Sequence, residues 1–350
     1  MKIRMAPKAS LSSESWGCVR PGDQILARRS ITERGGDPRP PPLSTINLKN
    51  MRTESLIVTD NLKIPVFFLG DNPKILLMAG IHGNEQTGVL ILRTLTRELS
   101  KKNRDFPVVI LPAANPEALK LNSRINPKDG VDLNRIFPVK KVESQSYAIG
   151  KVLQKFAEQF EIIIDFHVFV KQKTLICGVE LGTGGRKTQR QIRSLMSALE
   201  LDAICRIDHK NEPAKDGSLC AYLQSLNKLA FGVELPPDKF LTKLQKGRTI
   251  KSLLMLAYSY KKIIRGRAKD ILPIFVRQQF FSPGDGRFIP QAKIGNRVTK
   301  HGKMGILVFK TGRRHIITSP FSGKLISISY KRRTKKGEKL FVVGELINSL

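Results

Sequence analysis

The chain has 350 residues, of which 41% are hydrophobic, and its 61 Lys and Arg against 29 Asp and Glu give a formal net charge of +32. This length and apolar content suffice for one large domain with a buried core and a smaller second domain. No uninterrupted apolar run approaches the roughly eighteen residues of a membrane-spanning helix, so we expect no membrane contact.

The positive charge is concentrated toward the end of the chain, where residues 261–350 hold 21 Lys and Arg and 4 Asp and Glu, a net +17. Such a charge attracts anionic substrates or polyanions over long distances. We interpret most of it as solvated surface, and contact with nucleic acid is the alternative interpretation.

Residues 1–50 differ from the rest, since they are basic and rich in proline and show neither helical nor strand periodicity. They are predicted to form a disordered extension. The first residues lack the apolar block of a secretory signal. The four cysteines are scattered along the chain, which is typical of reduced thiols, and we expect a cytoplasmic protein.

From residue 51 on, apolar strand-like segments alternate with amphipathic helical segments. The predicted buried strands are 74–80, 106–114, 161–169 and 228–236. The predicted helices are 85–102, 146–160, 185–201 and 247–264. Strands that are apolar throughout and alternate with helices predict an α/β fold whose sheet is flanked by helices on both faces.

After about residue 270 the pattern changes to short strands separated by Gly, Pro and charged turns. This texture predicts a small all-β region. We therefore divide the chain into an α/β domain, residues 51–268, and a β domain, residues 269–350.

Polar side chains follow several of the predicted strands. His82 and Glu85 come after the first, Asn115 after the second, His167 near the end of the third, and Glu234 at the end of the fourth. Because ligands of α/β sheets bind beyond the carboxyl ends of the strands, these side chains can converge.

Two histidines and a carboxylate are a common catalytic zinc set. His82, Glu85 and His167 fit it, although an isolated HxxE pair is more often structural. The chain has only five histidines, and two of them lie at predicted strand ends. Gly83 lets the backbone pass close to a bound ion.

Residues 115–138 form a polar, loop-like segment interrupted by Asn-Pro and Asp-Gly turns. It carries Arg124, Asp132, Asn134 and Arg135, and a guanidinium beside an amide is suited to gripping a carboxylate. The alternative interpretation is a surface loop with solvated basic residues.

The motifs GIHGNE, NPEAL, DLNRIFP, DFH and VELP occur in this order. Together they resemble the aspartoacylase and succinylglutamate desuccinylase family of zinc hydrolases, which is related to zinc carboxypeptidases. The resemblance covers about residues 65–345 and leaves the first 50 unexplained. It implies a mixed sheet like that of zinc carboxypeptidases.

The resemblance also implies the metal site. His82, Glu85 and His167 would hold one Zn²⁺ per chain, and Asp132 would support the His82 ring through a hydrogen bond. Asp165 has no assigned role in this pattern. His209 lies in a polar segment and is expected to be solvated.

Four further residues receive roles from the resemblance. Glu234 would act as general base and then as general acid. Arg124 would polarise the scissile carbonyl and stabilise the oxyanion. Asn134 and Arg135 would bind a carboxylate of the substrate.

The C-terminal segments SPFSGKLISISY and KKGEKLFVVGE look like the barrel-sandwich module of lipoyl-type domains. No lysine lies in an acidic turn that would mark an attachment site, so we expect a structural cap over the active-site entrance. The basic run 331–339 is interpreted as a solvated hairpin, with anion binding as the alternative.

These observations favour a zinc-dependent hydrolase that cleaves the amide bond of a small anionic N-acyl amino acid. A zinc carboxypeptidase acting on peptide C-termini is the second hypothesis, because the same zinc, glutamate and arginine set serves both reactions. The third, from another class, is a noncatalytic nucleic-acid-binding protein that uses its basic C-terminal region.

Overall fold

The computed structural model describes residues 51–207, 217–265, 272–330 and 333–347. The predicted extension 1–50, His209 and the predicted domain boundary after residue 268 lie outside the described residues. No helix in these ranges is both long and apolar enough to cross a membrane.

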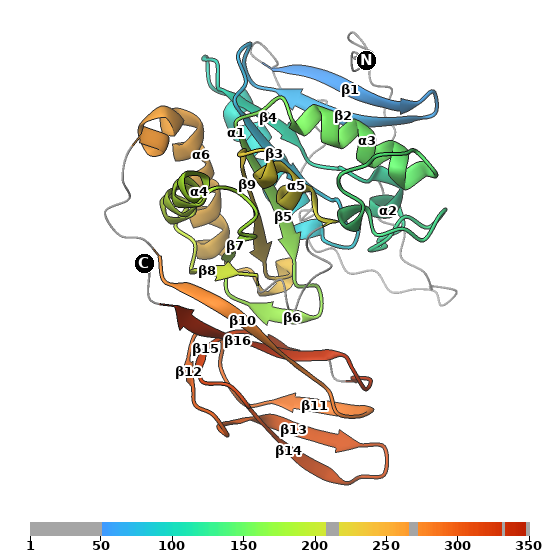
Figure 1. Ribbon diagram of the computed structural model, residues 1–350, viewed down its shortest axis with the longest axis vertical. Coiled ribbons are helices and arrows are strands. Elements are labelled where there is room, and N and C mark those ends of the chain that lie inside the picture. Colours follow the sequence, from blue (N-terminus) through green and yellow to red (C-terminus); the bar gives the residue numbers. More distant parts are fainter. Residues whose placement is uncertain (1–50, 208–216, 266–271, 331–332, 348–350) are drawn as a thin grey trace, which may run out of the picture.

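The described chain contains both strands and helices (Figure 1). The strands are β1 (Arg52–Thr59), β2 (Leu62–Phe68), β3 (Ile75–Ala79), β4 (Val108–Leu111), β5 (Ile162–Val168), β6 (Gln172–Thr174), β7 (Cys177–Glu180), β8 (Ala203–Arg206), β9 (Leu229–Leu235), β10 (Ile274–Phe281), β11 (Gly286–Pro290), β12 (Arg297–Val298), β13 (Lys303–Phe309), β14 (Arg314–Thr318), β15 (Gly323–Ser329) and β16 (Lys339–Ile347). The helices are α1 (Gln86–Ser100), α2 (Pro116–Lys120), α3 (Gln145–Ala157), α4 (Arg186–Ala198), α5 (Leu219–Ser225) and α6 (Lys243–Arg265), with 3₁₀ turns η2 (Leu133–Arg135) and η4 (Asp238–Phe240).

One large sheet organises the molecule, with its strands in the order β1-β2-β4-β3-β5-β9-β7-β8-β10-β16-β15-β12 and with β6 attached to β15. Strands β4, β3, β5 and β9 are parallel to one another. β2 runs antiparallel to β4, and β7 runs antiparallel to β9. The predicted α/β fold with a mixed sheet is therefore confirmed.

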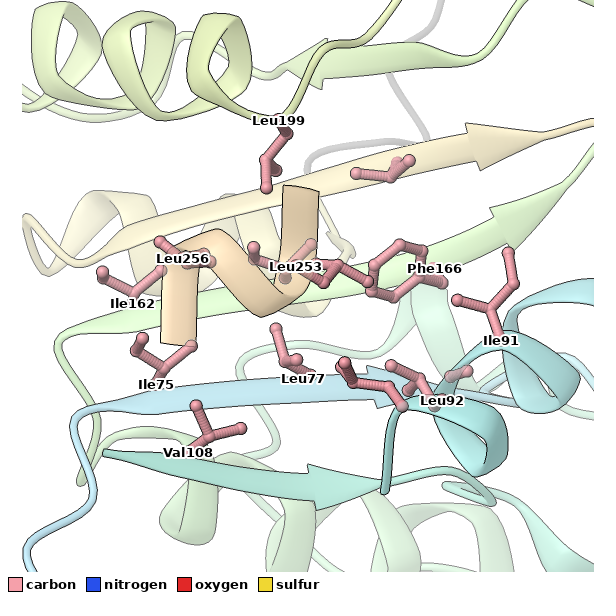
Figure 2. Close-up of a cluster of buried hydrophobic side chains, with 14 of the residues drawn as sticks. Ile75, Leu77, Ile91, Leu92, Val108, Ile162, Phe166, Leu199, Leu253 and Leu256 are labelled. Carbon is pink, nitrogen blue, oxygen red and sulfur yellow. The ribbon is translucent and has the colours of Figure 1, made fainter. Parts of the chain in front are cut away.

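Helices cover both faces of this sheet because the central strands bury side chains on both sides. On one face, alternate strand residues such as Ile75, Leu77 and Phe166 pack against α1, α4 and α6, as Figure 2 shows. On the other face, residues such as Leu76 and Ile163 pack against α3 and α5. The uniformly apolar strands of the sequence thus follow from two separate cores.

All elements in described residues 272–347 are strands, as predicted. β10 pairs in parallel with β8, and β16 and β15 follow it, so the large sheet continues into the C-terminal region. A second, antiparallel sheet, β11-β13-β14, lies farthest from the helices (Figure 1). The C-terminal region is therefore joined to the α/β part by backbone hydrogen bonds.

A fully buried carboxylate lies at the end of β7. Glu180 accepts from Arg193 Nε at 2.7 Å through Oε1 and from Arg206 Nε at 3.0 Å through Oε2. The Arg193 side chain belongs to α4, so this ion pair joins helix to sheet. Removing one partner of such a pair leaves the remaining charges without compensation.

We expect Glu180→Gln to lower the free energy of unfolding by on the order of 3 kcal/mol, because two partly buried guanidinium groups lose their counter-charge. Urea denaturation measures this loss. Glu98→Gln is the matched control, since Glu98 forms an exposed pair with Lys101, and it should change stability by less than about 0.5 kcal/mol. Equal losses in the two variants would contradict the role given to Glu180.

Candidate metal centre

Three side chains from two distant segments meet at the carboxyl edge of the sheet. His82 and Glu85 lie in the turn between β3 and α1, and His167 lies in β5. One ligand atom from each residue lies within 4.8 Å of the others. The structure thus brings together the three side chains that the sequence singled out as metal ligands.

Glu85 lies between the two imidazole rings. Its Oε1 is 2.9 Å from His82 Nδ1, and its Oε2 is 3.0 Å from His167 Nδ1. The backbone N–H of Val168 also donates to Oε2 at 2.9 Å. His82 Nδ1 is buried, and within the described residues it has no hydrogen-bond partner of suitable geometry. Two ring nitrogens and a carboxylate facing one another fit a zinc-type cation.

The far nitrogen of each ring is held by an aspartate. His82 Nε2 lies 2.9 Å from Asp132 Oδ1, and His167 Nε2 lies 2.8 Å from Asp165 Oδ2. A carboxylate at Nε2 favours the proton on that nitrogen, so in the neutral ring Nδ1 carries the lone pair that a metal ion would take. Asp165, which had no role in the sequence interpretation, thus orients His167 as Asp132 orients His82.

The charges of the cluster are strongly coupled. Burial opposes ionisation of Glu85, but the electrostatic interaction with His82 and the hydrogen bond from His167 hold the pKa of this carboxyl well below its usual value. Burial likewise opposes the charge of Asp132, yet His82 and then Arg124 lower its pKa. Burial disfavours protonated His167, but Asp165 and Glu85 raise its pKa to about 10. The carboxylates and the basic groups of the cluster thus stabilise one another's charged forms.

Asp165→Asn is expected to weaken zinc affinity about 10- to 100-fold, because an amide no longer fixes the His167 ring as a carboxylate does. Competition against a chromogenic chelator measures the affinity without relying on turnover. Asp71→Asn, at a side chain that is 90% exposed, should leave the affinity unchanged. An unchanged affinity in Asp165→Asn would contradict the assignment.

Arg124 lies on the solvent side of the cluster. Its side chain is 43% exposed, and it donates to Glu85 Oε1 and to Asp132 Oδ2, each at 3.0 Å. The guanidinium therefore joins the candidate ligand Glu85 to Asp132, the aspartate that holds His82.

Asn134 and Arg135 lie in η2, next to Asp132. Asn134 Oδ1 accepts from the backbone N–H of Leu219 at 2.9 Å, and its Nδ2 lies 3.4 Å from His167 Nε2. Arg135 donates to the carbonyl oxygen of Asn134 at 2.6 Å. The amide oxygen of Asn134 is thus occupied by α5, and its NH₂ group is the part that faces the site.

Glu234 lies beside His167, because the parallel ladder pairs these two residues of β9 and β5. Paired residues in neighbouring strands project on the same face of a sheet. The Glu234 side chain is buried, with 8% of the residue exposed, and within the described ranges its carboxylate accepts no hydrogen bond. A carboxylate without such a partner next to a candidate ligand is available to exchange protons with a water.

Asn115 and Gly83 differ from the sequence interpretation. Asn115 is the N-cap of α2, where its side chain accepts from Ala118 N at 3.3 Å, so it serves the helix and not the cluster. A Cβ at Gly83 would lie 2.0 Å from the carbonyl carbon of Ala118. Gly83 is therefore required by the close approach of α2. For Asn115, the following Pro116 was the feature of the sequence that indicated a helix N-cap.

Asp129 anchors the loop that carries Asp132. It accepts from Ser144 Oγ, and from both the backbone N–H and Oγ of Ser146 at the start of α3. Burial opposes its charge, but these hydrogen bonds lower the pKa of Asp129 below its usual value. A carboxylate from a remote loop thus caps α3.

Asp129→Asn is expected to cost about 1 kcal/mol of stability at pH 7 and much less near pH 3. Because the folded-state pKa is the lower one, this stabilisation is present above the unfolded-state pKa of about 4. It is lost as the pH falls through the folded-state pKa. Urea denaturation at both pH values, with Asp71→Asn as control, tests this. A pH-independent difference would contradict it.

A sequence profile of the succinylglutamate desuccinylase/aspartoacylase catalytic domain matches residues 71–257 of this chain. This range includes the three candidate ligands and both aspartates that orient them. It also includes Arg124 and Glu234.

Two curated relatives align with parts of the chain. The N-alpha-acetyl-L-2,4-diaminobutyric acid deacetylase of Halomonas elongata is 27% identical over 158 residues, which are 39% of this chain and 44% of the relative. The murein peptide amidase A of Escherichia coli is 28% identical over 142 residues, which are 40% of this chain and 45% of the relative. The chain thus spans less than half the length of either relative.

Solved structures match over more of the chain. The product-bound ectoine utilization protein EutE (DoeB) from Ruegeria pomeroyi is similar with a TM-score of 0.71 and 20% identity, over 86% of this chain and 97% of that chain. At this identity the likeness concerns the fold. The aligned 86% of this chain is more than the α/β part alone contains, so the likeness also covers strands of the C-terminal region.

Proposed function

Because this chain belongs to the succinylglutamate desuccinylase/aspartoacylase catalytic family, we propose that it is a zinc-dependent hydrolase that cleaves the amide bond of an N-acyl amino acid. The approach of the three ligand atoms of His82, Glu85 and His167 to within 4.8 Å carries this proposal. The orphaned, buried Nδ1 of His82 supports it, since a zinc ion would take the lone pair that no described donor uses.

His82, Glu85 and His167 would hold the ion, with Asp132 and Asp165 fixing the two rings. Zinc in such a site supplies Lewis acidity, which makes water nucleophilic near neutral pH and polarises a carbonyl. The remaining chemistry belongs to side chains of this protein.

Glu234 would take a proton from the attacking water and pass it to the leaving nitrogen. Its register beside His167 and the absence of a hydrogen-bond partner within the described residues support this role. Arg124 would stabilise the negative charge that develops on the carbonyl oxygen, since its guanidinium is exposed yet fixed by two carboxylates.

Arg135 and the NH₂ group of Asn134 would bind a carboxylate of the substrate. Both residues lie in η2 directly after Asp132, and Asn134 Nδ2 is 3.4 Å from the ring of a candidate ligand. A small anionic substrate also suits the net charge of +32, which attracts anions to the protein. We further propose a cytoplasmic location, on the scattered cysteines, of which three are buried thiols.

Cleavage of a peptide amide is the second candidate, and the likeness to murein peptide amidase A favours it. The same metal, base and arginine would serve both reactions. The two candidates differ in whether the group on the far side of the scissile bond is a simple acyl group or a peptide.

Metal analysis of the purified protein, followed by hydrolysis assays, tests the proposal. N-acyl amino acids and short peptides should be assayed side by side, with release of the free amine as the readout. We expect about one zinc per chain and turnover of N-acyl amino acids. Turnover of peptides alone would favour the second candidate. A protein that stays metal-free after zinc is supplied would refute both.

A further inference from the structure

The small C-terminal sheet exposes a row of isoleucines on its outer face. The register of β11, β13 and β14 places Ile289, Ile306 and Ile316 side by side. Ile289 is 37% exposed and Ile316 is 56% exposed. The alternate residues of these strands face the core of the C-terminal region, so the row is no part of that core. Contiguous exposed aliphatic side chains on one sheet face are typical of an interaction site.

Arginines lie next to this row. The same register aligns Arg287, Val308 and Arg314 across the three strands. Each lies two residues from an isoleucine of the row in its own strand, so both sets share one face of the sheet. Both arginines are exposed, and within the described residues neither forms an ion pair with a carboxylate. Lys310 and Arg313, in the turn before β14, add further exposed positive charge.

The acidic groups of the C-terminal region are few. Described residues 272–347 contain Asp285, Glu338 and Glu345. Asp285 accepts from the backbone N–H of Lys336, and Glu338 pairs with Lys171. Within the described residues none of the three forms an ion pair with Arg287 or Arg314.

One edge of this sheet is open. β14 stands at the end of the order β11-β13-β14, and no strand in the described residues pairs with its other edge. β14 also lies at the outer side of the C-terminal region, away from the helices (Figure 1). An extended segment can add to such an edge through backbone hydrogen bonds. Its alternate side chains would then lie beside Arg314 and Ile316.

We propose that the edge of β14 and the outer face of its sheet dock an extended acidic segment of another protein. A carboxylate would lie beside Arg314 and an aliphatic side chain beside Ile316, as cross-strand pairing favours. A second copy of this chain is a poor occupant, since it would bring arginines against arginines and a charge of +32 against itself. Nucleic acid would leave the isoleucines without a partner, because their face offers no aromatic ring for a base to stack on.

The test uses the full-length protein and a fluorescent peptide of about twelve residues with the repeat Glu-Ser-Leu-Ser, called the Glu-Leu peptide. Side chains two positions apart in a strand lie on the same face, so Glu and Leu can reach Arg314 and Ile316 together. The comparison probe, called the Glu-Ser peptide, has the repeat Glu-Ser-Ser-Ser and therefore the same length and charge but no Leu. Fluorescence anisotropy at low and moderate salt gives the dissociation constants. We expect the Glu-Leu peptide to bind about tenfold more tightly than the Glu-Ser peptide.

Two double variants separate the contributions of the two rows. Ile289→Ser with Ile316→Ser, and Arg287→Ser with Arg314→Ser, should each weaken binding of the Glu-Leu peptide about tenfold. Leu244→Ser with Lys63→Ser is the matched control, because both residues are exposed outside this sheet, and it should bind as the wild type does. Thermal unfolding of each variant confirms that it is folded.

Three outcomes would overturn the proposal. The first is no measurable binding of the Glu-Leu peptide to the wild type. The second is binding that neither double variant weakens. The third is that an oligothymidylate or phosphatidylglycerol vesicles bind in an arginine-dependent way while loss of the isoleucines has no effect, because the surface would then recognise phosphate and not a protein segment.

Discussion

Glu234→Gln is expected to retain its metal and to lose amide hydrolysis by a factor on the order of a thousand. The glutamine occupies the same place beside His167 in the ladder but cannot take a proton from water or return it to the leaving nitrogen. Because Glu234 is not one of the three clustered ligand residues, metal content should be unchanged. The effect should appear in kcat more than in KM.

The measurement combines metal analysis with steady-state kinetics on the best substrate of the N-acyl amino-acid panel. Glu345→Gln is the matched control, since Glu345 is an exposed glutamate of β16 far along the sheet order from β9. It should keep wild-type kinetics. A Glu234→Gln variant that retains both zinc and wild-type turnover would show that Glu234 is not the general base.

His82→Ala is expected to lose the metal and, with it, the activity. The substitution removes the buried Nδ1 that lies 2.9 Å from Glu85 and leaves Asp132 without its ring partner. Two ligands remain, and the carboxylates of Glu85 and Asp132 keep their contacts with Arg124. We expect zinc to fall below about a tenth of an ion per chain after dialysis, because removing one of three protein ligands leaves too few for tight binding.

Metal analysis after dialysis measures this loss, and unfolding curves show whether the protein remains folded. His315→Ala serves as control, since His315 is exposed in β14 and should have no effect on metal content. A His82→Ala variant that retains the wild-type metal content would show that the ion binds without His82. Metal loss caused by unfolding would appear as a lowered transition midpoint.

The alternation of strands and helices could be predicted from the sequence because it depends on local periodicity. Helix α1 was expected at 85–102 and is found at Gln86–Ser100, and the strand expected at 74–80 contains β3. The positions of His82, Glu85 and His167 after or near the ends of apolar strands were visible for the same reason. A strand end is marked by neighbours in the sequence.

The contacts that orient the cluster were decided by tertiary structure. Asp165 shares a face with His167 by strand alternation, which the sequence shows. Whether its carboxylate meets Nε2 or Nδ1 depends on how the ring is turned. Glu85, which is 82 positions earlier in the chain, holds Nδ1 and so leaves Nε2 to Asp165.

What the sequence alone determined about this protein is therefore the class of fold and the residue types available at its strand ends. Tertiary structure decided that Asn115 caps a helix, that Gly83 admits the backbone of α2, and that the C-terminal strands extend the large sheet. The physical reason is the separation along the chain of the residues that determine each feature. Periodicity and capping depend on residues within a few positions, whereas sheet order, ring orientation and close backbone approach depend on segments that meet only after the whole chain has packed.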